Sequence, residues 1–253
     1  MDKIIDAHIH LDHYDDDEID RIIATLEQVH CDKIITVSFD LASCKKNLLL
    51  AEKYSKVVPA FGFHPEQAIP TDVQFAELLA WMEKHQNKMC AIGEIGLPYY
   101  SRPVSIDPYV ELLDTFLKLA KKWDKPVVLH AVYDDAPIVC DLLEKNNIEN
   151  AHFHWFKGDE VTVSRMINNG YHISVTPDVL YETEIQQLVQ KYPLGQMMAE
   201  TDGPWQFEDV FSKEMTHPKM IHQSIAKIAT IKKESLTDVY QVLYENTIKF
   251  YNI

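Results

Sequence analysis

Arginine is scarce in this sequence of 253 residues. Only Arg21, Arg102 and Arg165 are present, against 39 acidic residues, and the formal net charge is -15 at pH 7. A field of that sign repels polyanions and argues against broad nucleic-acid binding. We therefore expect the partner to be a small molecule or a short nucleic acid, with no extended basic surface for a duplex.

Long apolar runs and closely spaced cysteines are also absent. No run reaches the roughly 18 apolar residues of a membrane span, and the N-terminus shows no basic and apolar export pattern. The four cysteines are widely spaced, which fits reduced, buried thiols: Cys31, Cys44, Cys90 and Cys140. The sequence favours a cytoplasmic protein that does not bind a membrane.

What the sequence does contain is a regular alternation of short β-branched runs and longer amphipathic stretches, which is typical of β-α units around a parallel sheet. Eight strands are expected at Ile4–His10, Lys33–Ser38, Val57–Phe63, Cys90–Ile95, Pro126–His130, Ala151–Trp155, His172–Val175 and Met197–Thr201. Helices are expected near 16–29, 42–55, 72–87, 106–123, 134–146, 159–169, 178–191, 213–231 and 235–250. The pattern predicts a (β/α)8 barrel of the TIM type, with residues 1–253 as a single domain because no linker divides the chain.

The first predicted strand carries a pair of histidines. Asp6, His8 and His10 alternate along it, so their side chains are expected on one face. Two imidazoles on one face can bind one metal ion. In a chain with 12 histidines such a pair also arises by chance, so the motif gains weight only if other strands bring ligands to the same end.

Metal-binding residue types recur at the carboxyl ends of the predicted strands, where barrels of this type have their active sites. Six of them form the predicted ligand set: His8, His10, Glu94, His130, His154 and Asp202. Four imidazoles and two carboxylates suit one or two divalent metals, with Glu94 bridging because a carboxylate has two oxygens. We assign His8, His10 and Asp202 to one ion and His130 and His154 to the other. Zinc suits the nitrogens, and magnesium and manganese stay open.

Such a centre predicts hydrolysis, because metal ions lower the pKa of a bound water and stabilise the oxyanion that forms. Asp202 is the candidate general base, and Glu94 is catalytic through the metals. Glu200 lies two residues before Asp202 and is expected to orient a ligand histidine. His152 is expected deeper in the barrel, hydrogen-bonded.

Two further residues are candidate substrate contacts. His64 precedes Pro65 on a turn after the third predicted strand, and it either contacts the substrate or has a structural role. Trp205 follows Asp202 and either forms a wall for a base or packs on its loop.

With these residues assembled, the chain resembles the TatD family of metal-dependent hydrolases, within the amidohydrolase-like superfamily. The matching segments are Asp6–Leu11, Gly62–Pro65, Gly93–Leu97, Pro126–His130, His154–Gly158 and Glu200–Pro204. The resemblance implies a distorted (β/α)8 barrel, a one- or two-metal centre built from the six ligands, and hydrolase activity, which in several members is a magnesium-dependent nuclease activity on DNA.

Three positions depart from the pattern of that family. Pro98 stands where the family usually has Asp, Val132 where it often has Arg, and Met215–Pro218 where it commonly has an Arg-Asn-x-Pro segment. Two of these changes remove cations that can hold phosphate. Arg102 and Lys157 are possible substitutes.

The leading prediction is a phosphodiester hydrolase that acts on short or single-stranded DNA. The first alternative is hydrolysis of a non-phosphate ester, lactone or amide, which the missing cations favour. The second is a non-catalytic metal-binding protein that kept the barrel.

Overall fold

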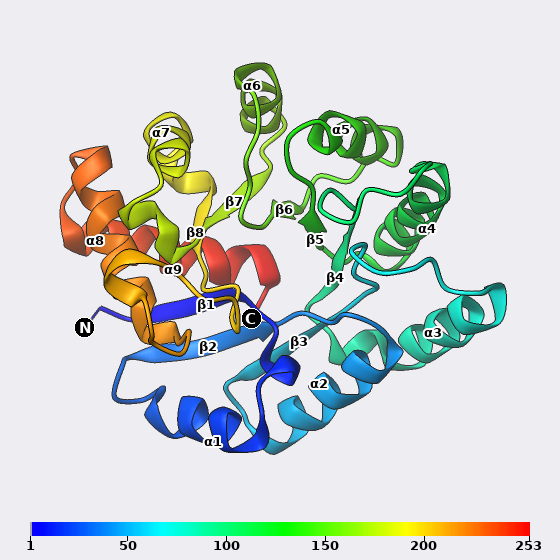
Figure 1. The fold of residues 1–253 in the computed structure, drawn as a ribbon, viewed down its shortest axis with the longest axis horizontal. Coiled ribbons are helices and arrows are strands. Elements are labelled where there is room, and N and C mark those ends of the chain that lie inside the picture. Colours follow the sequence, from blue (N-terminus) through cyan, green and yellow to red (C-terminus); the bar gives the residue numbers. More distant parts are fainter. Residues whose placement is uncertain (1) are drawn as a thin grey trace.

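Eight parallel strands form one sheet in the computed structural model, which describes residues 2–253 (Figure 1). Around the sheet they follow chain order: β1 Ile4–Ile9, β2 Cys31–Thr36, β3 Val57–Phe61, β4 Ala91–Gly96, β5 Val127–His130, β6 Ala151–Phe153, β7 His172–Val175 and β8 Met197–Ala199. Each pairs in parallel with the next. The predicted barrel is confirmed.

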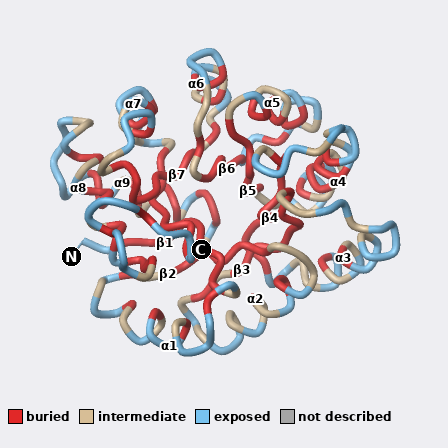
Figure 2. The backbone as a smooth tube through the Cα atoms, viewed as in Figure 1, coloured by how far each residue is buried: buried red, intermediate tan, exposed pale blue. Residues whose placement is uncertain are grey.

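Helices surround the sheet and turn their buried faces toward it (Figure 2). Their bounds are α1 Asp16–Thr25, α2 Leu41–Lys53, α3 Asp72–His85, α4 Asp107–Trp123, α5 Asp135–Lys145, α6 Glu160–Asn168, α7 Thr183–Lys191, α8 Ile221–Lys232 and α9 Leu236–Tyr251. In α4 the buried residues Leu113, Phe116, Leu117 and Ala120 recur every three or four positions, the spacing of an amphipathic helix. No helix within residues 2–253 is long and apolar enough to cross a membrane.

Two helices begin later than the sequence pattern predicts. The helix expected from residue 178 starts at Thr183, after a short 3-10 helix at Pro177–Leu180 and an extended residue, Glu182. The helix expected from residue 213 starts at Ile221, because His217 is extended and Pro218 begins another 3-10 turn. Apolar periodicity does not register these breaks, since both short turns also bury apolar side chains.

The first strand is less regular than a simple alternation predicts. Its pairing with β2 shifts register between Asp6 and Ile9. Ile5 packs in a cluster with Phe250, whereas Ile9 packs in the larger cluster that contacts the helices. The side chain of Asp6 turns toward Thr201 and accepts a hydrogen bond from its backbone N–H. Asp6 thus joins β1 to the segment after β8, and its Oδ1 also accepts the backbone N–H of His8 at 3.3 Å. That Asp6 shares a face with His8 and His10 stays a prediction.

Irregular backbone joins the last strand to the first. β8 ends at Ala199, and beyond it the N–H of Asp202 donates to the carbonyl of His8 at 2.9 Å. The N–H of His10 in turn donates to the carbonyl of Gly203 at 2.7 Å. These two hydrogen bonds connect the segment after β8 to the end of β1, at the rim that carries the predicted metal ligands.

A glycine permits the close approach of β4 and β5 at the rim. Gly96 has φ +155°, and a Cβ at this position would lie 2.0 Å from the carbonyl oxygen of His130. No other residue fits without moving β5, so Gly96 fixes the distance between the ends of β4 and β5.

The opposite end of the barrel is filled by apolar side chains. Phe250 and Tyr251 from the end of α9 pack against Ile5, Ala60 and Val128 of the strands. Figure 2 shows the C-terminus at the middle of the ring of strands. All four cysteines are buried and free, as the sequence analysis expects.

Candidate metal centre

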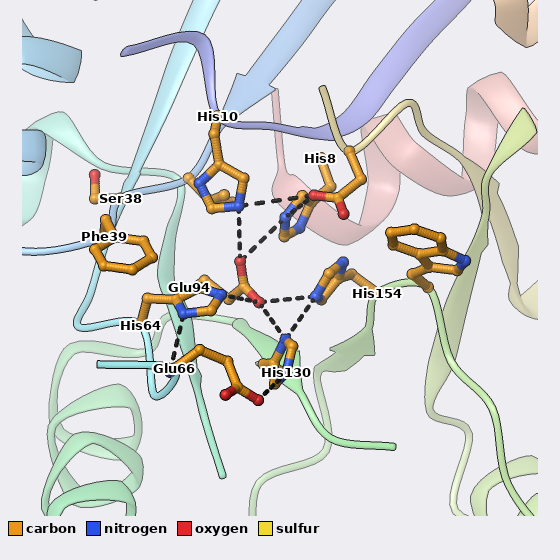
Figure 3. Close-up of polar contacts among 12 residues, drawn as sticks. His8, His10, Ser38, Phe39, His64, Glu66, Glu94, His130 and His154 are labelled. Carbon is orange, nitrogen blue, oxygen red and sulfur yellow. Dashed lines mark hydrogen bonds and ion pairs between the residues drawn. The ribbon is translucent and has the colours of Figure 1, made fainter. Parts of the chain in front are cut away.

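Glu94, in β4, lies at the centre of a ring of buried histidines (Figure 3). Its side chain has no exposed surface, and its two carboxylate oxygens face different groups. Oε2 faces His8 and His10, whereas Oε1 faces His130 and His154. One carboxylate thus divides the ring into two halves.

The first half is built at the junction of β1 and β8. The Nε2 atoms of His8 and His10 each lie 3.2 Å from Glu94 Oε2. Asp202 Oδ1 lies 3.3 Å from His8 Nε2 and 3.7 Å from His10 Nε2. Asp202 has a positive φ of 49° in the turn after β8, which directs its carboxylate toward β1.

The second half is built from the ends of β5 and β6. His130 Nδ1 lies 3.0 Å, and His154 Nε2 2.7 Å, from Glu94 Oε1. The two nitrogens are 3.3 Å apart. The halves touch, because the rings of His8 and His154 stack with their centroids 3.9 Å apart. The structure therefore brings all six predicted ligands together around Glu94. The groups whose ligand atoms lie within 4.8 Å of one another include His8 with His10 and Glu94, His8 with His154 and Asp202, and His64 with Glu94 and His130. The assignment of the ligands to two separate ions stays a prediction.

The donor set fits divalent metal. His8 Nε2 and Glu94 Oε2 are buried with no hydrogen-bond partner among residues 2–253, an arrangement that is costly unless a cation lies between such atoms. Two ligands of one tetrahedral ion, each about 2.0 to 2.2 Å from it, lie about 3.3 to 3.6 Å apart. Most of the distances above are close to that separation, so the centre needs little rearrangement to bind divalent ions.

Both carboxylates of the centre favour the ionised state. Burial alone raises the pKa of Glu94, but the surrounding histidines, above all His154, outweigh it and hold that pKa well below its usual value. Burial likewise acts against ionisation of Asp202, and the approach of His8 Nε2 to 3.3 Å lowers its pKa below the ordinary range. The centre therefore offers two negative charges to cations.

His64 faces the same carboxylate with a different role. Its Nδ1 accepts the backbone N–H of Glu66 at 3.1 Å, so a neutral imidazole carries its proton on Nε2. That Nε2 lies 3.2 Å from Glu94 Oε1. Burial lowers the pKa of His64, which favours the neutral ring. His64 is placed as a hydrogen-bond donor to Glu94, and with Glu94 and His130 it also forms one of the groups whose ligand atoms lie within 4.8 Å of one another.

Two buried residues near the centre, Glu200 and His152, make hydrogen bonds inside the barrel. Glu200 Oε1 accepts the backbone N–H of Trp155 at 2.8 Å and lies 3.8 Å from His154 Nδ1, so its contact with the ligand histidine is longer than a hydrogen bond. Burial raises the pKa of Glu200 to about 8. His152 bonds Tyr251 and Ser174 inside the barrel, which confirms its expected structural position.

The two cations proposed as substitutes at the rim, Arg102 and Lys157, differ in their pairing. Arg102 Nη1 donates to both oxygens of the buried Asp135, at 2.6 and 2.7 Å, so this guanidinium is already paired. Lys157 Nζ lies 5.6 Å from the centroid of the Trp155 ring, and no carboxylate within residues 2–253 pairs with it. Of the two proposed substitutes, the structure leaves Lys157 available. Trp205 is 60% exposed and packs edge-on against Trp155.

The segment at Met215–Pro218 has a structural role in this chain. His217 Nδ1 accepts the N–H of Lys219, and its Nε2 lies 2.8 Å from Thr25 Oγ1 in α1. Val132 is buried. Neither position supplies a cation to the centre.

Sequence reasoning missed Glu66. It lies two residues after His64, and its carboxylate lies 3.2 Å from His130 Nε2. Its position just beyond the end of β3 could have indicated a role at the rim. Acidic residues are common in loops, however, and the sequence does not show which group Glu66 contacts.

Known proteins resemble this chain along its whole length. Residues 5–252 match the family described as TatD related DNase. An uncharacterized metal-dependent hydrolase of Haemophilus influenzae is 38% identical, covering 99% of this chain and 100% of the relative. Human deoxyribonuclease TATDN3 is 26% identical over 98% of this chain and 94% of its own. The crystal structure of YJJV, a TatD homolog from Escherichia coli K12, superposes with a TM-score of 0.90 at 26% identity, covering 99% and 98% of the two chains. The chain belongs to the TatD family of metal-dependent hydrolases.

Proposed function

We propose that this protein hydrolyses phosphodiesters, with short or single-stranded DNA as the substrate class. The proposal depends on the position of Glu94. Its two carboxylate oxygens face different metal-binding side chains. A human relative named as a deoxyribonuclease, similar along nearly the whole chain, supports the choice of DNA.

In this proposal the chain's residues have distinct tasks. His8, His10 and Asp202 would hold one divalent ion, His130 and His154 would hold the other, and Glu94 would contribute to both. When bound, such ions would supply an activated water and stabilise negative charge on the scissile group. Asp202 is ionised and at the edge of the centre, so it accepts the proton of the nucleophile.

The remaining candidates contact the substrate. The Nε2–H of His64 faces Glu94 Oε1 in the free protein and would turn to an oxygen of the scissile group when substrate binds, because Nδ1 accepts a backbone N–H. Trp205 presents an exposed indole beside Asp202, on which a base can stack. These two contacts recognise an oxygen and a flat ring, and both are compatible with a nucleotide.

The positive charge of bound metal ions would allow an acidic protein to bind an anionic substrate. Glu94 and Asp202 carry two negative charges, Glu66 beside His130 carries a third, and two divalent ions would carry four positive ones. The loaded centre would therefore have a local excess of about one positive charge, which attracts phosphate at short range while the net charge of -15 acts at longer range.

A second candidate is hydrolysis of a non-phosphate ester, lactone or amide. The pairing of Arg102 with the buried Asp135 favours it, because this pairing removes an arginine from phosphate recognition at the rim. Such a substrate needs the same activated water and no cation beyond the metals.

A substrate panel separates these candidates. Protein reconstituted with zinc, magnesium or manganese is assayed on single- and double-stranded oligonucleotides, a simple phosphodiester, carboxyl esters, lactones and amides, each with and without chelator. Phosphodiester cleavage that falls steeply with salt supports the first proposal, because phosphate contacts release counterions. Chelator-sensitive turnover of esters or amides with a flat salt response supports the second. Stoichiometric metal binding without turnover, unchanged in Asp202→Asn, would contradict both and indicate a metal-binding protein.

A further inference from the structure

The carboxylate of Glu66 has four nitrogen partners at the rim of the barrel. Oε1 accepts the backbone N–H groups of Tyr99 and Tyr100 at 2.6 and 2.8 Å, and Oε2 accepts that of Ser101 at 2.7 Å. The fourth partner is His130, whose Nε2 lies 3.2 Å from Oε1. The Glu66 side chain is only 13% exposed, so water competes little for these bonds.

Glu66 and Glu94 lie at opposite ends of the His130 ring (Figure 3). Nε2 faces Glu66, and Nδ1 faces Glu94 at 3.0 Å. Three backbone N–H groups already donate to the two oxygens of Glu66, so this carboxylate acts as an acceptor. When the lone pair of His130 Nδ1 binds a cation at the centre, the ring proton lies on Nε2, and Glu66 accepts it.

Within residues 2–253 this support distinguishes His130 from the other histidines assigned as ligands. Their nitrogens that point away from Glu94 have no hydrogen-bond partner: Nδ1 of His8, His10 and His154. Nothing in their surroundings selects one tautomer by a hydrogen bond. The geometry of Glu66 instead orients the ring and selects its tautomer at the same time.

We propose that Glu66 is a positioning residue that holds His130 with Nδ1 toward the metal centre, an inference that rests on the proposed role of His130 as a ligand. Because the same carboxylate binds Tyr99, Tyr100 and Ser101, the loop after β4 is coupled to this imidazole. Glu66 does not itself face the centre, since the His130 ring lies between it and Glu94.

The test measures metal binding and the state of the ring, without any substrate. Zinc is titrated into metal-free wild type, Glu66→Ala, Glu66→Gln and His130→Ala, with stoichiometry and affinity followed by calorimetry. We expect Glu66→Ala to weaken the second zinc by about ten- to a hundred-fold and to leave the first unchanged. Glu66→Gln keeps one acceptor oxygen and is expected to recover part of the affinity.

A spectroscopic measurement reports the tautomer. In zinc-loaded wild type labelled with ¹⁵N-histidine, His130, assigned by comparison with His130→Ala, should show its proton on Nε2. In Glu66→Ala that signal should broaden or shift through exchange with water. A role limited to anchoring the loop would not move this resonance.

Asp159→Ala provides a matched control. Asp159 also accepts two backbone N–H groups, those of Val161 and Thr162, but contacts none of the ligand histidines. It should keep wild-type zinc affinity and an unchanged His130 signal.

The possible outcomes separate this proposal from the proposed function. If Glu66→Ala binds two zinc ions as tightly as wild type, with His130 still protonated on Nε2, Glu66 is only a loop anchor and the proposal is wrong. If His130→Ala binds zinc like wild type, His130 is not a ligand and the proposal also fails. Failure of wild type to cleave any substrate overturns the proposed function, while the zinc titrations still decide the role of Glu66.

Discussion

Asp6 in β1 and Thr201 after β8 are joined by two hydrogen bonds, and this pair closes the barrel beneath the centre. Asp6 Oδ1 accepts the backbone N–H of Thr201 at 2.9 Å, and Oδ2 accepts its hydroxyl. Both residues are fully buried. Thr201 immediately precedes Asp202, so the bond also positions a proposed ligand.

Asp6→Asn should therefore destabilise the fold. The amide oxygen of Asn still accepts the backbone N–H of Thr201, but the NH2 group replaces the acceptor of the Thr201 hydroxyl, which leaves a buried donor unsatisfied at a cost of about 1–3 kcal/mol. Urea unfolding of the metal-free protein measures the loss. Asp15→Asn is the control, because the exposed Asp15 caps α1 and Asn caps a helix equally well. Equal stability of Asp6→Asn and wild type would contradict a role of this pair in closing the barrel.

Glu94→Ala should abolish stabilisation by metal. A single bound ion at a free concentration one hundred times its Kd adds about 2.7 kcal/mol to the free energy of unfolding. Wild type should show this as a rise of the thermal midpoint with zinc, and Glu94→Ala should not. Turnover should fall by orders of magnitude, with the far-ultraviolet spectrum unchanged.

Glu83→Ala controls for the loss of a carboxylate, because Glu83 is exposed and pairs with Lys122 away from the centre. It should respond to zinc like wild type. A zinc-induced rise of equal size in Glu94→Ala would show that Glu94 does not hold the metal.

Stability should fall in mild acid partly through His217. Burial lowers the pKa of this histidine from 6.5 to about 4, so the fold favours the neutral ring. Its contribution is complete above pH 6.5 and is lost as the pH falls toward 4, because the unfolded chain binds the proton first. His217→Asn keeps an acceptor for the N–H of Lys219 and does not titrate.

The free energy of unfolding of both proteins, measured from pH 8 to pH 4, provides the test. The difference between wild type and His217→Asn should change between pH 6.5 and 4 and stay constant above that range. A constant difference over the whole range would rule out His217 as a source of acid sensitivity.

Trp205→Ala should weaken substrate binding without affecting the fold. The indole is 60% exposed, so its removal should change the free energy of unfolding by less than about 0.5 kcal/mol. Stacking of a base on an aromatic ring contributes about 1–3 kcal/mol, and KM for an oligonucleotide should rise accordingly while zinc affinity is retained. Val73→Ala, a change at an exposed apolar residue of α3, serves as the control. An unchanged KM would remove Trp205 from the substrate contacts.

The repeated pattern of strands and helices was readable from the chain because it is local. β-branched runs such as Val127–His130 and amphipathic stretches such as α4 are set by residues close together in the sequence. The starts of α7 and α8 were placed too early, since Pro177 and Pro218 begin short turns that bury apolar side chains.

The six proposed ligands could also be found in the sequence, because parallel strands of a barrel deliver their carboxyl ends to one rim. The role of Glu66 could not. Its partners are Tyr99 to Ser101, in the loop after β4, and His130, at the end of β5. A local sequence pattern does not predict which distant groups a loop residue contacts.

The amino-acid sequence by itself determined the order of elements, the rim on which His8, Glu94 and Asp202 gather, and the family. Only the tertiary structure decided that one oxygen of Glu94 faces His8 and the other His154, that Arg102 is paired with Asp135, and that His64 presents a protonated Nε2. The physical reason is that periodicity follows from neighbours along the chain, whereas the direction of a hydrogen bond depends on groups that folding brings together from distant segments.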